Sequence, residues 1–248
     1  MPRRLFKELE RSYGFDEVAI VPGQVTINPD LTSTKMTIGN ISLDIPVLAS
    51  AMDGAVSPHF ATLMHQMGGL GVLNAEGLYT RYEDPYSVLE EIMSIPQSEI
   101  TEHLQHVYSE PIQENLVAQR VQEIRESGAT CAVSFTPQNT KRMSPVAVEA
   151  GAEMVVVQST VTTARHMSRS YRGLIFSEMV SSLKVPVVVG NCVTYSVAQE
   201  LMETGIDGIL VGVGPGAACT TREVVGVGVP QVTATLECAA AREDYFRR

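Results

Sequence analysis

Cys219 is the residue whose type and position best suit covalent chemistry. It follows an apolar run and a turn with Gly214 and Gly216, which predicts a loop at the end of a strand. The hydroxyl of Thr221 and the charge of Arg222 are close to it in sequence, and such neighbours lower the pKa of a thiol and make it a nucleophile. The alternative is a small buried hydrophobic residue, which is the common role of a free cysteine.

The glycine-rich turn before Cys219 permits two further kinds of chemistry. Its carbonyl oxygens can bind a monovalent cation, and its N–H groups can bind phosphate. The pattern is not the dinucleotide-binding fingerprint, because the third glycine and the acidic residue about 20 residues further on are missing. The turn alone therefore leaves both ligands open.

The other three cysteines are widely spaced, at Cys131, Cys192 and Cys238. No two cysteines have the C-x-x-C spacing, so neither a disulfide framework nor a zinc site is predicted. Cys131 lies in a predicted strand and Cys238 in a predicted C-terminal helix over residues 233–246, so we expect both in the core. Any role for a cysteine is expected to be that of an individual thiol.

Six short apolar runs are the predicted strands that position these groups. None alternates between apolar and polar residues, which indicates strands buried on both faces, as in a parallel sheet covered by helices. The runs are residues 45–50, 70–74, 130–135, 154–158, 185–190 and 208–213. Apolar residues at helical spacing predict helices over residues 58–67, 112–127, 144–150, 171–183 and 196–204.

Repeated strand–helix units indicate either an open doubly wound sheet or an α/β barrel. Two more units at the same spacing would extend beyond residue 248, so a complete eight-stranded barrel does not fit, and the spacing leaves both architectures open. The long interval between the second and third strands is predicted to hold a loop over residues 77–86 and one or two helices.

The composition limits the class of protein. Of the 248 residues, 44% are apolar and 19% are charged, and 18 Lys+Arg against 28 Asp+Glu give a net charge of −10. This charge disfavours nucleic acid as a partner. No segment has about 18 consecutive apolar residues, and the N-terminus lacks the apolar part of a signal peptide. We therefore expect a soluble cytoplasmic protein with no membrane partner.

A longer stretch around Cys219 is specific enough to indicate a family. Residues 212–222, Gly-Val-Gly-Pro-Gly-Ala-Ala-Cys-Thr-Thr-Arg, closely resemble the catalytic-cysteine loop of the IMP dehydrogenase/GMP reductase family. Residues 15–22, 49–53 and 190–194 resemble other segments of that family in the same order, so the resemblance covers nearly the whole chain. The interval between the second and third strands is too short for a CBS pair. The sequence thus resembles most the IMP dehydrogenase-related subgroup without a CBS module. The resemblance implies a TIM (β/α)8 barrel of which about six of the eight strands are present. Residues 1–248 are accordingly expected to form a single α/β-barrel catalytic domain that is incomplete at its C-terminus and has no CBS domain.

The resemblance implies a mechanism. Cys219 would attack C2 of a purine 5′-nucleotide and form a covalent adduct, which makes hydride exchange with NAD or NADP possible. Thr221 is similar to the family threonine that helps to move protons at the thioimidate stage.

The resemblance also implies contacts to ligands. Residues similar to the nucleotide-binding ones are Ser50, Met52, Asn191, Gly216 and Ala217. Gln158 and Ser159 match the positions on the nicotinamide side. The main-chain carbonyls of Gly214, Gly216 and Cys219 would bind potassium in a potassium-dependent member.

Two positions depart from the family pattern. Gln158-Ser159 stands where members usually have an Asp that holds the nicotinamide side, and the amide of Gln158 brings hydrogen bonds but no charge. Ala217 stands where a serine commonly contacts the phosphate, and it offers only its backbone N–H. The seventh and eighth strands, with their glycine-rich phosphate loops, have no counterpart in the 248 residues.

Three site residues have a simple structural alternative. Asn191 can be a turn residue after a strand, and Met52 can be ordinary core filling. Asp53, which follows the first strand, can be a loop cap rather than a catalytic carboxylate.

Three functions follow from these observations. The leading hypothesis is an oxidoreductase that converts IMP to XMP through a Cys219 thioimidate with hydride transfer to NAD. A GMP reductase, which converts GMP to IMP with NADPH and releases ammonia, is the rival within the family. A non-catalytic nucleotide-binding or regulatory protein is the alternative from another class. The resemblance also implies a homo-oligomer, usually a tetramer in this family.

Overall fold

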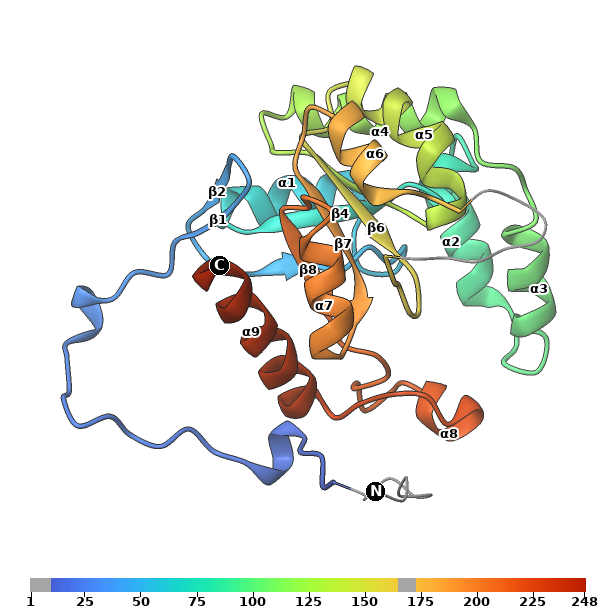
Figure 1. Cartoon of the computed structure of the whole chain (residues 1–248). Helices are drawn as coiled ribbons and strands as arrows, with labels where there is room; N and C mark the ends of the chain where they lie inside the picture. Colours follow the sequence, from blue (N-terminus) through green and yellow to red (C-terminus); the bar gives the residue numbers. More distant parts are fainter. Residues whose placement is uncertain (1–9, 165–172) are drawn as a thin grey trace.

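A curled sheet of six parallel strands is the centre of the computed structural model, which describes residues 10–164 and 173–248 (Figure 1). Each strand pairs with its predecessor in sequence. A doubly wound sheet reverses its strand order part-way, so this order is that of a TIM-barrel wall and confirms the prediction of about six barrel strands. The strands are β3 Leu48–Ala49, β4 Leu70–Asn74, β5 Ala132–Phe135, β6 Met154–Gln158, β7 Val187–Cys192 and β8 Gly208–Val211.

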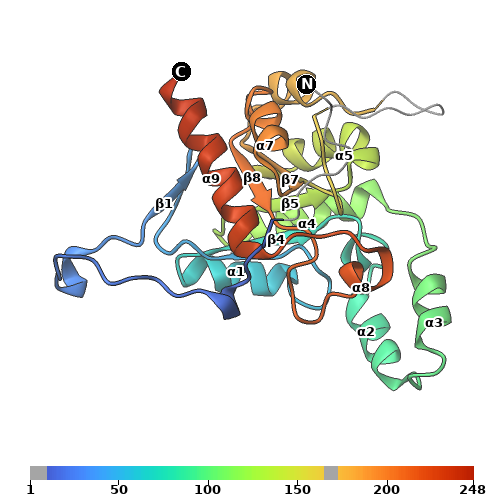
Figure 2. The ribbon, with the colours of Figure 1, turned by 60° about the horizontal axis from the view of Figure 1, so that its bottom comes forward.

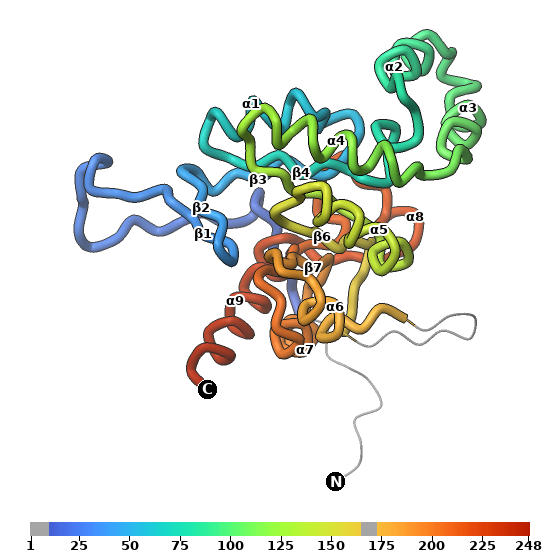
Figure 3. The backbone as a smooth tube through the Cα atoms, turned by 90° about the horizontal axis from the view of Figure 1, so that it is seen from above, coloured from blue at the N-terminus to red at the C-terminus, as the bar shows by residue number. Residues whose placement is uncertain are grey.

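Helices cover the outer face of the sheet (Figures 1 and 3). The helices of this layer are α1 Pro58–Gln66, α4 Glu114–Glu126, α5 Pro137–Glu149, α6 Phe176–Ser182, α7 Tyr195–Met202 and α9 Gln231–Arg247. Helix α1 packs on β4, α5 packs on β5 and β6, and α7 packs on β7 and β8, while α4 lies against α1 and α5. Helix α9 packs on α7 and on β8, at the open edge of the sheet.

Successive residues of a strand enter two different cores. In β6, Met154 and Val156 belong to the core on the concave side of the sheet, whereas Val155 and Val157 pack under the helices. All four are at most 3% exposed. Because neighbouring side chains point to opposite faces and both faces are covered, the four residues from Met154 to Val157 are all apolar.

A β-hairpin that the sequence analysis did not predict closes the concave side. Its strands, β1 (Met36–Ile38) and β2 (Ile41–Leu43), are antiparallel and add three buried apolar side chains to the concave core. The hairpin lies at the amino ends of the strands, where a side chain at Gly39 would collide with Pro186 just before β7. Gly39 has a φ of +56°, which favours glycine at this turn.

The interval between β4 and β5 holds a separate projection of two helices (Figures 1 and 3). The chain passes through a short 3-10 helix, η3 (Leu78–Thr80), then α2 (Pro85–Ser94) and α3 (Ile100–Val107). Arg120 of α4 fixes the start of this excursion by donating hydrogen bonds to the carbonyls of Tyr79 and Glu83, at 3.0 and 2.7 Å. The prediction of one or two helices here is confirmed.

The N-terminal segment runs outside the barrel wall before it reaches the hairpin (Figures 1 and 3). It contains two 3-10 turns, η1 (Phe15–Glu17) and η2 (Pro29–Leu31). At its start, the backbone N–H of Tyr13 donates to Oγ1 of Thr233 at 2.8 Å, and the Tyr13 carbonyl accepts from the N–H groups at the start of α9. The segment is thus tied to the last helix of the chain.

The predicted boundaries differ from the observed ones at several places. The first predicted strand, 45–50, pairs only over β3, and α5 begins at Pro137 rather than at residue 144. The start of the helix predicted over 171–183 lies outside the described residues, which place α6 at Phe176–Ser182. A further short helix, α8 (Thr221–Val225), follows Cys219 and was not predicted. None of the helices in the described ranges has both the length and the apolar character of a membrane span.

Candidate active site

The predicted site residues lie at one edge of the sheet, because parallel strands present their carboxyl ends together. Figure 2, in which this side is turned forward, shows the loop from β8 passing to α8 before the chain enters α9. The site positions are Ser50 and Met52 after β3, Gln158 and Ser159 at the end of β6, Asn191 near the end of β7, and Gly214, Gly216, Ala217, Cys219 and Thr221 after β8.

Cys219 is exposed on the loop between β8 and α8, so it is not a buried hydrophobic residue. Its Sγ lies 3.2 Å from Oγ1 of Thr221. Hydrogen bonds from the side chain and backbone of Thr221, followed by the charge of Arg222, lower the pKa of the Cys219 thiol from its ordinary value. A solvent-accessible thiol with a lowered pKa can act as a nucleophile.

Two contacts close the base of the loop that carries Cys219. The N–H of Val229 donates to the carbonyl of Val213 at 3.1 Å, so the two ends of the loop run side by side. The aliphatic part of Arg222 lies against Gly214 and Gly228, and a side chain at Gly228 would overlap it. Both glycines have positive φ, +63° and +155°. The glycines therefore allow Arg222 to fold back across the loop behind the thiol.

Asn191 joins the ends of three neighbouring strands. Its Nδ2 donates to the carbonyl of Gly212 after β8, at 2.9 Å. Its backbone N–H donates to the carbonyl of Ser159 after β6, at 3.1 Å. Its Oδ1 is buried and has no partner among the described residues. Asn191 is therefore a cross-strand link with an unused acceptor and not only a turn residue.

Ser159 borders a hollow of about 310 Å³ beyond β5 and β6. Its Oγ lies 2.8 Å from Oγ1 of Thr162, and that hydroxyl donates to the carbonyl of Gly190 at 2.5 Å. Thr136 and Phe176 are among the other residues of the wall, so hydroxyl-bearing residues and an aromatic residue border the same hollow. Gln158 pairs with Gly190 in the sheet and does not line this space.

The loop after β3 exposes Met52 and buries Asp53. Met52 is 57% exposed, which rules out core filling, and Ser50 beside it is also exposed. Oδ2 of Asp53 accepts hydrogen bonds from the N–H of Leu78 at 3.0 Å and from the hydroxyl of Tyr108 at 2.6 Å. Asp53 is thus the loop cap that the sequence offered as an alternative to a catalytic carboxylate, and its Oδ2 already accepts two hydrogen bonds.

The turn before Cys219 keeps backbone groups available to a ligand. The carbonyl of Gly216 accepts the N–H of Cys219 at 3.0 Å, which still leaves it a second lone pair. Ala217 is exposed in the same turn. Within the described residues no hydrogen bond joins Cys219 to Asn191 or to the loop after β3, so these groups share an edge of the sheet without being hydrogen-bonded to one another.

Two residues that the sequence analysis missed hold the site together. Tyr108 is 55 positions from Asp53 along the chain, and no local sequence pattern predicts a hydrogen bond between such distant residues. Thr162 is 4% exposed and bonds both Ser159 and the end of β7. The sequence signal for Thr162 was its place three residues after Ser159, at which its hydroxyl can bond to the serine that ends the strand.

Comparison with known sequences identifies the family. Residues 12–246 match the sequence profile of the IMP dehydrogenase / GMP reductase domain. The chain belongs to the IMP dehydrogenase/GMP reductase family of oxidoreductases. The resemblance to this family seen in the sequence is thereby confirmed.

Relatives and a solved structure give the extent of the similarity. The chain is 36% identical over 242 residues to an uncharacterized oxidoreductase of Mycolicibacterium smegmatis, covering 95% of this chain and 64% of that protein. It is 29% identical to the inosine-5′-monophosphate dehydrogenase of Cryptosporidium parvum, covering 96% of this chain and 60% of that one. A crystal structure of an IMP dehydrogenase/GMP reductase-like protein from Corynebacterium glutamicum superposes with a TM-score of 0.89 at 32% identity, covering 97% and 64%. The chain thus spans about three fifths of the length of these relatives.

Proposed function

We propose that this site oxidises IMP to XMP with NAD, and that Cys219 is its nucleophile. The observation that carries the proposal is the exposed thiol after β8, with its Sγ 3.2 Å from the hydroxyl of Thr221. The lowered pKa of Cys219 supports it, because the thiolate is the attacking form.

The residues of the chain account for the covalent part of the reaction. The thiolate of Cys219 adds to C2 of the purine ring, and loss of hydride from C2 leaves a thioimidate. Water then attacks C2, the carbon–sulfur bond breaks, and XMP and the free thiol are released. The Thr221 hydroxyl, beside the sulfur, carries the proton that passes between water and the thiol.

The residues beyond β5 and β6 fit a nicotinamide cofactor. The hollow beside Ser159 combines an aromatic wall at Phe176 with the hydroxyl of Thr136 and the amide of Gln138, which suit a planar ring bearing a carboxamide. NAD, when bound, accepts the hydride that leaves C2. Ser159, which lines this hollow, is proposed to contact the nicotinamide. Gln158 lies outside the hollow and is proposed to face the nicotinamide side from the end of β6 without supplying a charge.

The remaining ligand contacts are proposals from family membership. Ser50, Met52, Asn191, Gly216 and Ala217 are proposed to contact the nucleotide, and the unused Oδ1 of Asn191 is a ready acceptor. The carbonyls of Gly214, Gly216 and Cys219 are proposed to bind potassium. A homo-oligomer and a cytoplasmic location are part of the same proposal.

The test measures turnover and the covalent adduct together. With IMP and NAD we expect absorbance from NADH and, after rapid acid quench, an added nucleotide mass on the peptide with Cys219. C219A should lose both, whereas C131A, which alters a buried thiol, should retain both. NADPH consumption with GMP and no reaction with IMP would instead establish the reductase. Binding of IMP without turnover or adduct would favour the non-catalytic alternative.

A further inference from the structure

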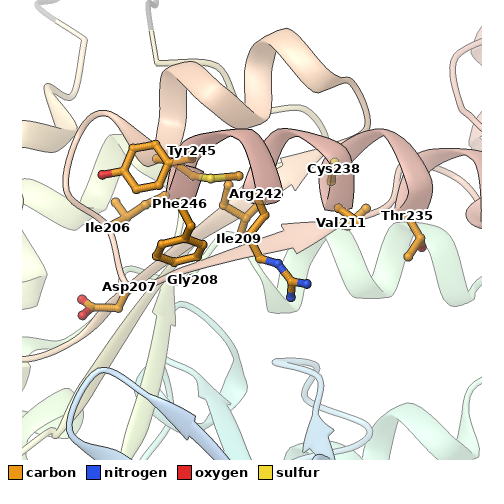
Figure 4. A pocket seen from close by; sticks show the side chains of 12 residues that line it. Ile206, Asp207, Gly208, Ile209, Val211, Thr235, Cys238, Arg242, Tyr245 and Phe246 are labelled. Carbon is orange, nitrogen blue, oxygen red and sulfur yellow. The ribbon is translucent and has the colours of Figure 1, made fainter. Parts of the chain in front are cut away.

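One hollow in the described part of the structure lies away from Cys219, between β8, α7 and α9 (Figure 4). Its volume is about 340 Å³, and Ile206, Ile209 and Phe246 make much of its wall apolar. Figure 4 shows that Cys238 of α9 reaches the same space, near Val211. The hollow thus leads from the outside of the sheet to a thiol that is otherwise only 6% exposed.

Behind Cys238 lies a second thiol. Sγ of Cys238 is 3.8 Å from Sγ of Cys192, which is 2% exposed at the end of β7. The two residues are 46 positions apart, so this proximity corrects the expectation that each cysteine stands alone. A disulfide bond has a sulfur–sulfur length of about 2.05 Å, so a displacement of roughly 1.8 Å would join the pair.

We propose that Cys192 and Cys238 form an oxidisable dithiol site, which a hydroperoxide converts to an intramolecular disulfide through the hollow beside α9. The proposal is independent of the reaction performed at Cys219. Its geometric basis is the approach of the two sulfurs and the access that the hollow gives to one of them.

The environment assigns different roles to the two thiols. The hydrogen bond from Cys192 lowers the pKa of Cys238, and the same contact together with burial raises the pKa of Cys192. Cys238 is therefore the thiol that is ionised first and also the one that the oxidant reaches. Cys131 is a natural contrast, since burial raises its pKa to about 12 and no other cysteine is close to it.

The oxidation proceeds in two balanced steps. The thiolate of Cys238 attacks one oxygen of the peroxide, the oxygen–oxygen bond breaks, and the leaving hydroxide takes up a proton, which leaves a sulfenic acid on Cys238. Cys192 then loses its proton and attacks Sγ of Cys238, the sulfur–oxygen bond breaks, and a second water leaves. Two thiols and one molecule of hydrogen peroxide thus give one disulfide and two waters.

The disulfide would join the two supports of the catalytic-cysteine loop. The carbonyl of Cys192 accepts the N–H of Gly212, where that loop begins, at 3.0 Å. Nε2 of Gln231, where α9 begins and the loop ends, donates to the carbonyl of Val211 at 3.0 Å. A covalent bond from β7 to α9 therefore fixes the last helix on the open side of the sheet and holds both ends of the loop.

The experiment uses the 248-residue C219A chain, so that the exposed thiol cannot exchange with the pair. The folded chain is treated with hydrogen peroxide, quenched with catalase, denatured, alkylated and digested without reduction. We expect a peptide with Cys192 linked to one with Cys238 and 2 Da lighter than the two thiol peptides together, while Cys131 is recovered alkylated. Oxidation should also raise the midpoint of thermal unfolding by several degrees, and dithiothreitol should reverse the rise.

The matched control adds C192A to C219A, which leaves Cys238 without a resolving partner. This variant should accumulate sulfenic or sulfinic acid on Cys238 and show no rise in midpoint. If C192A prevents folding, the peptide map of the C219A chain alone decides. Recovery of Cys192 and Cys238 as separate alkylated peptides, or a link from either of them to Cys131, would overturn the proposal.

Discussion

The hydroxyl of Tyr108 donates a 2.6 Å hydrogen bond to Oδ2 of Asp53, and this bond joins the projection of α2 and α3 to the loop after the first barrel strand. The same oxygen accepts the N–H of Leu78, so one carboxylate holds three segments. Asp53 is 9% exposed, so little water reaches its carboxylate and the hydrogen bonds that it accepts come mainly from the protein.

Removal of this carboxylate should destabilise the fold. We expect D53A to lower the free energy of unfolding by about 1 to 3 kcal/mol, because the buried N–H of Leu78 and the part-buried hydroxyl of Tyr108 lose their acceptor, and Y108F to lower it by about 1 kcal/mol. Urea denaturation measures both, with D30A on the exposed N-terminal segment as the control within about 0.5 kcal/mol of the parent. A D53A chain as stable as D30A would show that the tie contributes nothing.

The reactivity of Cys219 should depend on its neighbour two residues on. Because Thr221 lowers the pKa of the thiol, the rate of alkylation by iodoacetamide should rise at a lower pH than for an ordinary cysteine. T221A should move the midpoint of this pH profile upward, whereas T220A, a threonine with no hydrogen bond to the sulfur, should leave it in place. Identical profiles for the three chains would remove the assigned role of Thr221.

Phosphate recognition should improve when a hydroxyl is restored in the turn. Ala217 offers its backbone N–H alone, and the net charge of −10 gives no general attraction for a nucleotide dianion. We expect weak IMP binding, in the millimolar range or beyond, at which the binding energy is about −4 kcal/mol. A217S should tighten it about threefold to tenfold, the value of one added hydrogen bond. Calorimetry with inosine, which has no phosphate, is the control, and an equal gain for inosine would contradict this assignment.

The outer edge of β8 should cause association. In the described sheet β8 pairs with β7 alone, so its other edge has unpaired backbone groups. Light scattering should give a mass that rises steadily with concentration above the 26.9 kDa of one chain. A constant monomer mass with cooperative unfolding would be contrary to this prediction, and a plateau at a tetramer would favour the proposed oligomer over edge pairing.

The sequence predicted the elements whose patterns are local. The valine-rich runs of β6 and β7 identify strands covered on both faces, because each residue type fits either core. The hairpin of β1 and β2 escaped notice because its strands have three residues each, although Gly39-Asn40 between them is a turn signal. The start of α5 was missed because Pro145 and the polar residues before it hide the helical spacing.

The site was predicted as a set of positions but not as a set of contacts. Strand ends place Asn191 and Ser159 on the same edge, which the topology rule anticipates. The bonds of Tyr108 to Asp53 and the approach of Cys192 to Cys238 join residues 55 and 46 positions apart. Such pairs depend on how helices pack against strands, and no spacing along the chain encodes them.

The projection of α2 and α3 begins and ends at the same place on the barrel wall. The hydroxyl of Tyr82, just before α2, donates to the carbonyl of Val107, the last residue of α3, at 2.9 Å. Because the two ends of the projection are hydrogen-bonded to each other, the packing of the barrel wall does not depend on which residues connect them. The segment from Pro85 to about His106 is therefore a natural graft point, where an unrelated folded unit with adjacent termini, such as a fluorescent reporter, can replace the two helices while Tyr108 keeps its hold on Asp53.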